Sequence, residues 1–319
     1  MLSTDRFLKA DADGIHVIDT GFQRPCFDAS YLVVEKGRGA FVDTGTNHSV
    51  PRLLAALQAL GLQREDVDFV IATHVHLDHA GGVGLLMSEL PAARLIVHPR
   101  GARHLIDPSQ LMEGARAVYG AEEVRRSYGD VIGVPAERVV TTEDGMTLDF
   151  AGRTLRFLDT PGHARHHHCI WDERSRGCFT GDTFGLSYPE FDTDRGPYVL
   201  PTTTPVQFEP EALRASVQRL LSFAPRRMYL THYGAVADVP RLGEMFLEQL
   251  DAVVALGDAL DARPGRDAAL RRGLGELYLQ RLRAHGCTLP DAQVLELLAM
   301  DIELNAQGMG IWLDKRAAR

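Results

Sequence analysis

The chain has 319 residues, of which 45% are hydrophobic and 24% are charged, and its formal net charge is −9. This composition is typical of a globular protein with room for a large core and a smaller additional subdomain. The acidic balance argues against a protein whose main task is to bind nucleic acid phosphates. No apolar run suits a membrane span or a signal peptide, and the four cysteines are scattered, so we expect a cytoplasmic protein.

The start of the chain reads as a β-meander followed by a helix. Residues 14–44 show strand-like apolar runs and lead into Asp43-Thr44-Gly45, a polar tip behind an apolar strand. Residues 51–61 then show the apolar spacing of an amphipathic helix, with a proline at its start and a glycine behind it.

A strand at 68–72 leads directly into the densest group of ionisable side chains. It is followed by Thr73-His74-Val75-His76-Leu77-Asp78-His79 and by a Gly-Gly pair that opens an apolar helical stretch. Because alternate residues of an extended segment face the same way, His74 and His76 can point at one position. Asp78 and His79 can face a second position. Imidazole and carboxylate groups are ligands for zinc and similar divalent ions, so the motif predicts a metal site at the end of a strand.

Three later strand signals also end in ligand-type side chains. His163 follows a strand and a Pro-Gly turn, Asp182 follows an apolar strand and a glycine, and His232 follows a strand at 227–230. Polar groups at the ends of separate strands are expected to meet at one edge of the fold. Residues 100–136 form a polar helical excursion, which we expect either to cover the site or to lie on the surface.

Beyond residue 238 the pattern changes to three helical stretches, at 241–262, 266–285 and 291–314. We therefore predict a catalytic domain at 1–238 and an all-helical subdomain at 239–319. Because its apolar positions must be buried, the subdomain is expected to wall the substrate pocket or to form a homodimer contact. Its polar residues Asp301, Glu303 and Asn305 are predicted to be solvated helix positions.

Residues 14–235 resemble the metallo-β-lactamase superfamily and hold every ligand motif of its two-metal members, in the expected order. The resemblance implies an α/β fold, an αββα sandwich of two β-sheets with helices outside, followed here by a C-terminal all-helical extension. It implies one metal held by His74, His76 and His163, a second held by Asp78, His79 and His232, and Asp182 as the carboxylate that bridges both. Asp43 would orient ligands through hydrogen bonds.

These assignments predict a hydrolase. We expect two divalent ions, with zinc as the first choice and iron or manganese as alternatives. They would lower the pKa of a bridging water, and the resulting hydroxide would cleave a small ester, thioester or lactone. Asp78 or Asp182 could carry a proton to the leaving group. We expect a small-molecule substrate, and neither nucleic acid nor a membrane as a partner.

Two other functions stay open. A mononuclear iron persulfide dioxygenase would use a similar ligand set, and a non-catalytic metal-binding protein would share it without turnover. Persulfide dioxygenases and the binuclear glyoxalase II branch, which this chain resembles, usually follow the bridging aspartate with a Gly-Cys-Gly-Arg-type segment. Here the chain reads Thr183-Phe184-Gly185-Leu186-Ser187-Tyr188, so the subfamily stays open.

Five further residues are candidates for the substrate pocket: His166, His167, Phe184, Tyr188 and Tyr233. The two histidines belong to a Gly-His-Ala-x-His-His run, and one of them is expected to hydrogen-bond the bridging carboxylate or to reach the substrate, or else to cap the loop backbone. Tyr188 and Tyr233 are candidates for an oxyanion donor, with a wall or packing role as the expected alternative, since tyrosine combines an apolar ring with a polar tip.

Overall fold

The computed structural model describes residues 4–203, 205–261 and 264–318, which fall into two compact units. The first unit combines the residues up to 159 with 166–181 and 225–237. The second combines 160–165, 182–224 and the residues from 238 onward. The predicted domain boundary between residues 238 and 239 stays a prediction.

Seven strands form the first sheet of the first unit, in the order of the sequence. They are β1 (Leu8–Ala10), β2 (Ile15–Asp19), β3 (Ala29–Glu35), β4 (Arg38–Val42), β5 (Val67–Ala72), β6 (Arg94–Val97) and β7 (Val139–Thr141). Strands β1 to β4 pair antiparallel, and β2 to β4 form the meander predicted at residues 14–44, whereas β4 to β7 are parallel. Because β4 and β5 are parallel neighbours, the residues that follow them lie at the same edge of the sheet.

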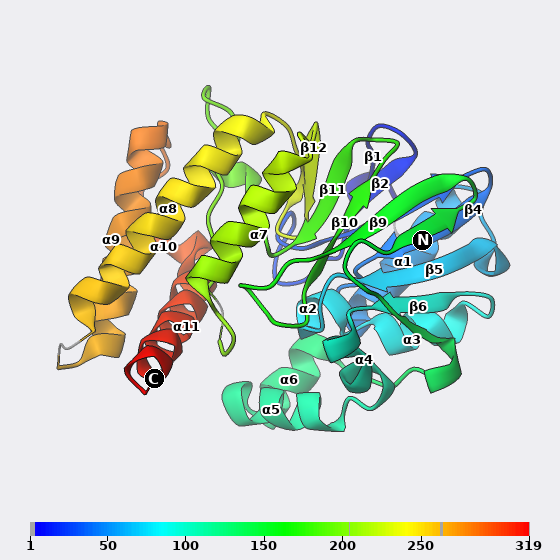
Figure 1. Cartoon of the computed structure of the whole chain (residues 1–319), viewed down its shortest axis with the longest axis horizontal. Coiled ribbons are helices and arrows are strands. Elements are labelled where there is room, and N and C mark those ends of the chain that lie inside the picture. Colours follow the sequence, from blue (N-terminus) through cyan, green and yellow to red (C-terminus); the bar gives the residue numbers. More distant parts are fainter. Residues whose placement is uncertain (1–3, 204, 262–263, 319) are drawn as a thin grey trace. The chain divides into compact units, whose positions relative to one another are not determined.

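The second sheet of this unit has six strands, in the order β13-β12-β11-β10-β9-β8. Their bounds are β8 (Thr147–Phe150), β9 (Arg153–Asp159), β10 (His168–Asp172), β11 (Gly177–Gly181), β12 (Arg227–Leu230) and β13 (Gly234–Val236). All neighbours are antiparallel except β11 and β12. In Figure 1 the first sheet contains the blue β1 and β2 and the cyan β5 and β6, and the second contains the green β9, β10 and β11 and the yellow β12.

The two sheets pack face to face around an apolar core to which both contribute. Tyr31 of β3 lies 5.2 Å from Phe179 of β11, and Phe179 lies 4.7 Å from Tyr229 of β12, measured between ring centroids. All three rings are fully buried, and such aromatic burial contributes roughly 1.5–3 kcal/mol per side chain. The hydroxyl of Tyr31 also donates a hydrogen bond to the Leu230 carbonyl across the two sheets.

Helices cover the other face of the first sheet. Side chains that alternate with the inner ones, such as Leu32 and Phe41, pack there with Leu53 and Leu57 of α1 and with Leu86 of α3. The helices of this unit are α1 (Val50–Ala59), α2 (Leu77–Ala80), α3 (Val83–Glu89), α4 (Pro99–Ile106), α5 (Ser109–Tyr119) and α6 (Ala121–Tyr128). The last three form the predicted excursion, in which α5 contacts both α4 and α6 (Figure 1).

The second unit contains α7 (Pro210–Ser222), α8 (Val239–Leu260), α9 (Arg266–His285), α10 (Asp291–Leu297) and α11 (Ala299–Ala317). Within it α8 contacts α7, α9 and α11. The fold class is confirmed: two sheets with helices, followed by C-terminal helices. One boundary prediction was wrong, because residues 291–314 form two helices that divide at Leu298, where ψ is 7°.

A second correction concerns Asn305, which is buried rather than solvated. Its Oδ1 accepts a hydrogen bond from the backbone N–H of Thr203 at 2.7 Å, and its Nδ2 lies 2.9 Å from the hydroxyl of Tyr278. A polar side chain can be buried when its donors and acceptors are used in this way, which helical spacing alone does not reveal.

Candidate metal centre

The site begins where the parallel strands β4 and β5 end. Val42 of β4 pairs with Ile71 of β5. Asp43, directly after β4, and Thr73, directly after β5, therefore lie close together. The backbone N–H of Asp43 donates to the Ile71 carbonyl at 2.8 Å, and the N–H of Thr73 donates to Oδ1 of Asp43 at 2.8 Å. Asp43 has a φ of 54°, a left-handed conformation that aspartate adopts more readily than most residues.

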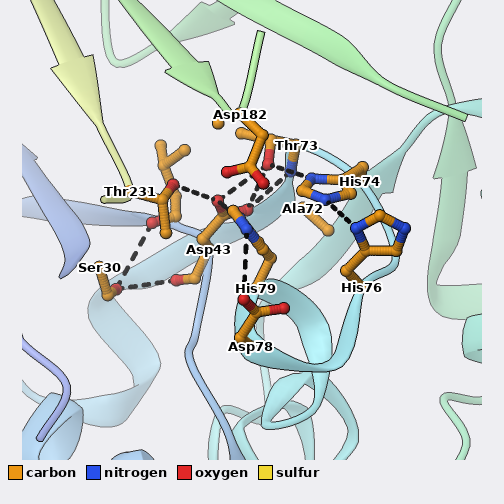
Figure 2. A network of polar contacts seen from close by, with 12 residues as sticks. Ser30, Asp43, Ala72, Thr73, His74, His76, Asp78, His79, Asp182 and Thr231 are labelled. Carbon is orange, nitrogen blue, oxygen red and sulfur yellow. Dashed lines mark hydrogen bonds and ion pairs between the residues drawn. The ribbon is translucent and has the colours of Figure 1, made fainter. Parts of the chain in front are cut away.

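The carboxylate of Asp43 is buried and collects several donors (Figure 2). The hydroxyls of Thr73 and Thr231 lie 2.8 and 2.9 Å from Oδ2, and Nδ1 of His79 lies 2.8 Å from the same oxygen. The hydroxyl of Ser30 donates to the Asp43 carbonyl at 2.8 Å. These hydrogen bonds fix the orientation of the Asp43 carboxylate, which in turn orients His79.

His74 and His76 bring two ring nitrogens together at the end of β5. Nε2 of His74 lies 2.9 Å from Nδ1 of His76, and the ring centroids are 4.4 Å apart. Nδ1 of His74 is 3.2 Å from the Thr73 hydroxyl. As the alternation of an extended segment predicts, both side chains point at one position, where a cation could accept a lone pair from each.

Asp78, His79 and His232 form a second convergent set. Their ligand atoms all lie within 4.8 Å of one another, and Oδ2 of Asp78 is 3.3 Å from Nε2 of His232 and 3.9 Å from Nε2 of His79. Nδ1 of His232 is 2.9 Å from the Phe27 carbonyl, which can only accept, so that nitrogen carries the proton. The Asp43 carboxylate has the same effect on Nδ1 of His79. Both Nε2 atoms are therefore lone-pair donors beside a carboxylate, a donor set that fits a divalent metal ion.

His163 and Asp182 belong to the second unit. Nε2 of His163 lies 3.3 Å from Oδ2 of Asp182, and Nδ1 lies 2.9 Å from the hydroxyl of Thr202. Asp182 is joined directly to Gly181, the last residue of β11, and His163 lies in the segment between β9 and β10. Their role as metal ligands stays a prediction.

The histidines after His163 are all buried. The ring of His166 lies 5.6 Å from that of His76, and burial lowers the pKa of His166 to about 3, which keeps the ring neutral. The ring of His167 stacks on His74 at 4.8 Å. A Cβ atom on Gly181, whose φ is 45°, would lie 2.6 Å from Nε2 of His167, so the close approach requires glycine.

The three aromatic pocket candidates have packing contacts. Phe184 and Tyr188 are fully buried within the second unit; Phe184 stacks on Phe246 at 5.7 Å, and the Tyr188 hydroxyl lies 3.3 Å from the Asp301 carboxylate. Tyr233 is half-buried against the core between the sheets. Their role in a substrate pocket, like that of His166 and His167, stays a prediction.

Two features of the site were not found from the sequence. Asp28 is fully buried next to the segment that holds His232, and no spacing rule distinguishes it from an ordinary surface aspartate. Leu77, between His76 and Asp78, packs against Met112 of α5 and Val124 of α6. The polar helical pattern at 100–136 left open whether these helices cover the site or lie on the surface.

The fold and these side chains define a two-sheet α/β protein with potential metal ligands at its strand ends. Residues 24–232 match the family described as the metallo-β-lactamase superfamily, and the chain belongs to that superfamily. Within the described part of the chain, no helix has the length and apolar character needed to cross a membrane.

Two relatives are similar along most of the chain. The metallo-β-lactamase fold-containing protein ST1585 of Sulfurisphaera tokodaii is 26% identical over 242 residues, which cover 74% of this chain and 84% of that protein. A crystal structure of ST1585 matches with a TM-score of 0.61 over 76% of this chain and 87% of that one. The family protein TTHA1429 of Thermus thermophilus is 22% identical and matches with a TM-score of 0.65 over 96% and 94% of the two chains, a likeness of fold.

A third relative has an enzyme name. The atrochrysone carboxyl ACP thioesterase of Aspergillus fumigatus is 28% identical over 155 residues, which cover 48% of this chain and 39% of that enzyme. The chain thus spans well under half the length of this relative.

Proposed function

We propose that the protein is a metal-dependent hydrolase that cleaves a small thioester, ester or lactone. The observation that carries the proposal is the convergence of Asp78, His79 and His232, with the two Nδ1–H groups turned away toward Asp43 and the Phe27 carbonyl. The superfamily is mostly hydrolytic and usually binds metal ions, which supports the same reaction class.

Two sets of residues would hold two divalent ions, for which we propose zinc. Asp78, His79 and His232 make up one set, and we propose His74, His76, His163 and Asp182 as the other. Chain connectivity supports the second set, because Asp182 follows β11 directly and the segment with His163 joins β9 to β10. Bound divalent ions would lower the pKa of a coordinated water toward neutrality and polarise the bond under attack. Asp78, which is half-buried beside both histidines, is suited to accept and return a proton.

Among the three bond types, a thioester has support from two relatives. The Aspergillus fumigatus thioesterase and thioesterase pkgB of Emericella nidulans are 28% and 29% identical to this chain over 155 residues each. In both cases the similarity covers 48% of this chain. The shared stretch supports a common reaction, and we propose a small-molecule thioester as the first substrate class to test.

We further propose that the α5–α6 hairpin walls the substrate side of the metal-binding turn. Leu77 of that turn is 7% exposed and packs against Met112 and Val124, which are themselves buried. Tyr128, at the end of α6, contacts Phe22, and Phe22 contacts Phe27, whose ring lies 5.3 Å from His232. The hairpin is thus linked to both sides of the Asp78, His79 and His232 set.

The test measures metal content and hydrolysis on the same preparations. Wild type, Asp182→Ala and the control Asp194→Ala would be analysed for metals and assayed on acyl thioesters, lactones, carboxyl esters and phosphodiesters. Asp194 is an exposed carboxylate of the same unit, so both variants lose one negative charge. We expect roughly two zinc ions per chain in wild type and the control, and fewer in Asp182→Ala together with lost thioester cleavage.

Two outcomes would contradict the proposal. A single iron per chain with oxygen uptake and no hydrolysis would identify an oxidoreductase. Tight metal binding without turnover on any of the substrates would identify a metal-binding protein. The four cysteines are scattered along the sequence, which supports a reducing compartment, and we propose the cytoplasm as the site of action.

A further inference from the structure

Asp28 lies immediately before β3, alongside the residues that follow β12. The Phe27 carbonyl accepts the hydrogen bond from Nδ1 of His232, and the N–H of Ala29 donates to the Thr231 carbonyl at 2.8 Å. These two contacts lie on either side of Asp28 and fix its backbone next to His232. Its side chain is fully buried.

The carboxyl group of Asp28 has little to compensate a negative charge. Its Oδ2 lies 2.5 Å from the hydroxyl of Thr20, and its Oδ1 is buried and has no hydrogen-bond partner in the part of the chain described. Burial raises the pKa of Asp28 to about 7, while His232 and His79 act to lower it and Asp78 acts to raise it. The ionisable groups that act on the Asp28 carboxyl are therefore Asp78, His79 and His232, the members of the second ligand set.

Asp43 shows by contrast how a buried carboxylate is normally stabilised. It receives hydrogen bonds from the N–H and hydroxyl of Thr73, the hydroxyl of Thr231 and Nδ1 of His79. Asp28 has one such partner, although asparagine would fill the same space without the cost of a buried charge. Within the described part of the chain, the Asp28 carboxyl has one hydrogen-bond donor, Thr20, and the imidazoles of His232 and His79 are the groups whose charge would favour its ionised form. A bound cation is the strongest local charge that a site of this kind can acquire.

We propose that the Asp28 carboxylate is a through-space counter-charge for a divalent cation held by Asp78, His79 and His232. The inference rests on the proposed metal centre and adds to it a residue outside the ligand sets. Asp78 contributes the single negative charge of its own ligand set, and the charge of Asp43 is spread over its donors. Asp28 would supply a second negative charge next to this ligand set. It is a positioning residue, because it acts on the cation and not on the substrate.

The experiment compares Asp28→Asn with Asp68→Asn. Asparagine has the size of aspartate and removes only the charge, and Asp68, which pairs with Arg38 at the start of β5, provides the same change of net charge away from the ligand set. Each full-length protein would be stripped of metal and titrated with Co²⁺, whose absorption reports each bound ion, and its metal-free thermal midpoint would be measured. For Asp28→Asn we expect an affinity for one of two cobalt ions about ten- to a hundredfold lower. We expect the metal-free Asp28→Asn protein to melt no lower than wild type.

The outcomes separate this inference from the proposed function. Wild type that fails to bind a second cobalt ion would refute the metal centre itself, and the counter-charge with it. Two ions bound by Asp28→Asn within about twofold of the wild-type affinities would refute the role of Asp28 alone. An equal loss in Asp68→Asn would show a general charge effect and also overturn it. If Asp28→Asn does not fold, Asp28→Ser is titrated in its place and judged by the same criteria.

Discussion

Asp43 and His79 are joined by a 2.8 Å contact between Oδ2 and Nδ1, and this contact decides which nitrogen of His79 faces Asp78. The two residues follow different strands: Asp43 comes directly after β4, and His79 lies in α2, the short helix after β5. A histidine held in this way keeps Nε2 as its lone-pair nitrogen without needing a metal to select it. The metal-binding geometry is thus partly set by the fold.

The first prediction concerns Asp43→Asn. In wild type one carboxylate oxygen of Asp43 accepts hydrogen bonds from His79, Thr73 and Thr231. If the amide NH₂ of asparagine takes the place of that oxygen, a donor faces these three donors. We expect the variant to lose about 2–4 kcal/mol of unfolding free energy and about ten- to a hundredfold in zinc affinity. Urea denaturation of the metal-free protein and competition with a zinc chelator would measure both.

Ser30→Ala is the matched control for that variant. It removes one hydrogen bond to the backbone carbonyl of Asp43 and leaves the carboxylate contacts intact. We expect a loss of about 1 kcal/mol and an unchanged zinc affinity. If the two variants bind zinc equally well, the carboxylate of Asp43 does not orient the ligands.

Leu77→Ala tests the contact between the metal-binding turn and the α5–α6 hairpin. Leu77 stands between His76 and Asp78 and is buried against Met112 and Val124. The smaller side chain leaves a cavity that costs about 2–4 kcal/mol, and it frees the turn to move. We therefore expect zinc to be transferred to a chelator faster than from wild type. Stopped-flow absorbance would measure the rate.

Leu57→Ala provides the comparison for Leu77→Ala. Leu57 lies in α1 and is 2% exposed in the separate core between the helices and the first sheet. A similar loss of stability is expected, with zinc release at the wild-type rate. Equal acceleration in both variants would mean that global loosening, and not the turn, controls release.

Gly181→Ala tests the tight junction before Asp182. The new methyl group would lie 2.6 Å from both Nε2 of His167 and Oγ1 of Thr73, at a φ of 45°. Gly145 also has a positive φ, of 79°, but its Cβ would meet nothing within 4 Å. We expect Gly145→Ala to cost about 1–2 kcal/mol from backbone strain alone and Gly181→Ala to cost more and to weaken zinc binding. Equal costs in denaturant melts would show that the neighbours yield without penalty.

The strands and the approach of His74 to His76 could be predicted because their signals are local. The apolar run at 68–72 became β5 with one residue added, and the alternation of His74 and His76 follows from an extended backbone. The helix expected at 266–285 has those bounds in the structure. In each case residues near in sequence determine the outcome, so composition and period suffice.

The features that could not be predicted depend on contacts between residues far apart in the sequence. Asp28 is buried because β3 lies beside the segment after β12, and Asn305 is buried because it bonds to the backbone of Thr203. Nothing near either residue distinguishes it from a solvated polar side chain. The break between α10 and α11 at Leu298 was not predicted either, because the sequence has no proline or glycine there to indicate it.

The last prediction concerns the stability of the metal-free protein in acid. His168 of β10 is fully buried, with Nε2 2.9 Å from the Ala72 carbonyl and Nδ1 2.9 Å from the hydroxyl of Thr142. Burial lowers the pKa of His168 to about 3, from an ordinary value of 6.5. Below about pH 6.5 the unfolded chain therefore binds a proton that the folded chain does not. The stabilising contribution is complete above that pH and is lost as the pH falls toward 3.

His168→Gln isolates this effect, because glutamine is polar and does not titrate. We expect wild type to lose about 1 kcal/mol more unfolding free energy than the variant between about pH 6.5 and 5.5, where few carboxylates titrate. Urea melts of both metal-free proteins at the two pH values would measure the difference. The variant is less stable throughout, since its side chain fits the Ala72 and Thr142 contacts less well, so the comparison rests on slopes. Parallel slopes would mean that His168 is protonated as easily in the folded protein as in the unfolded chain.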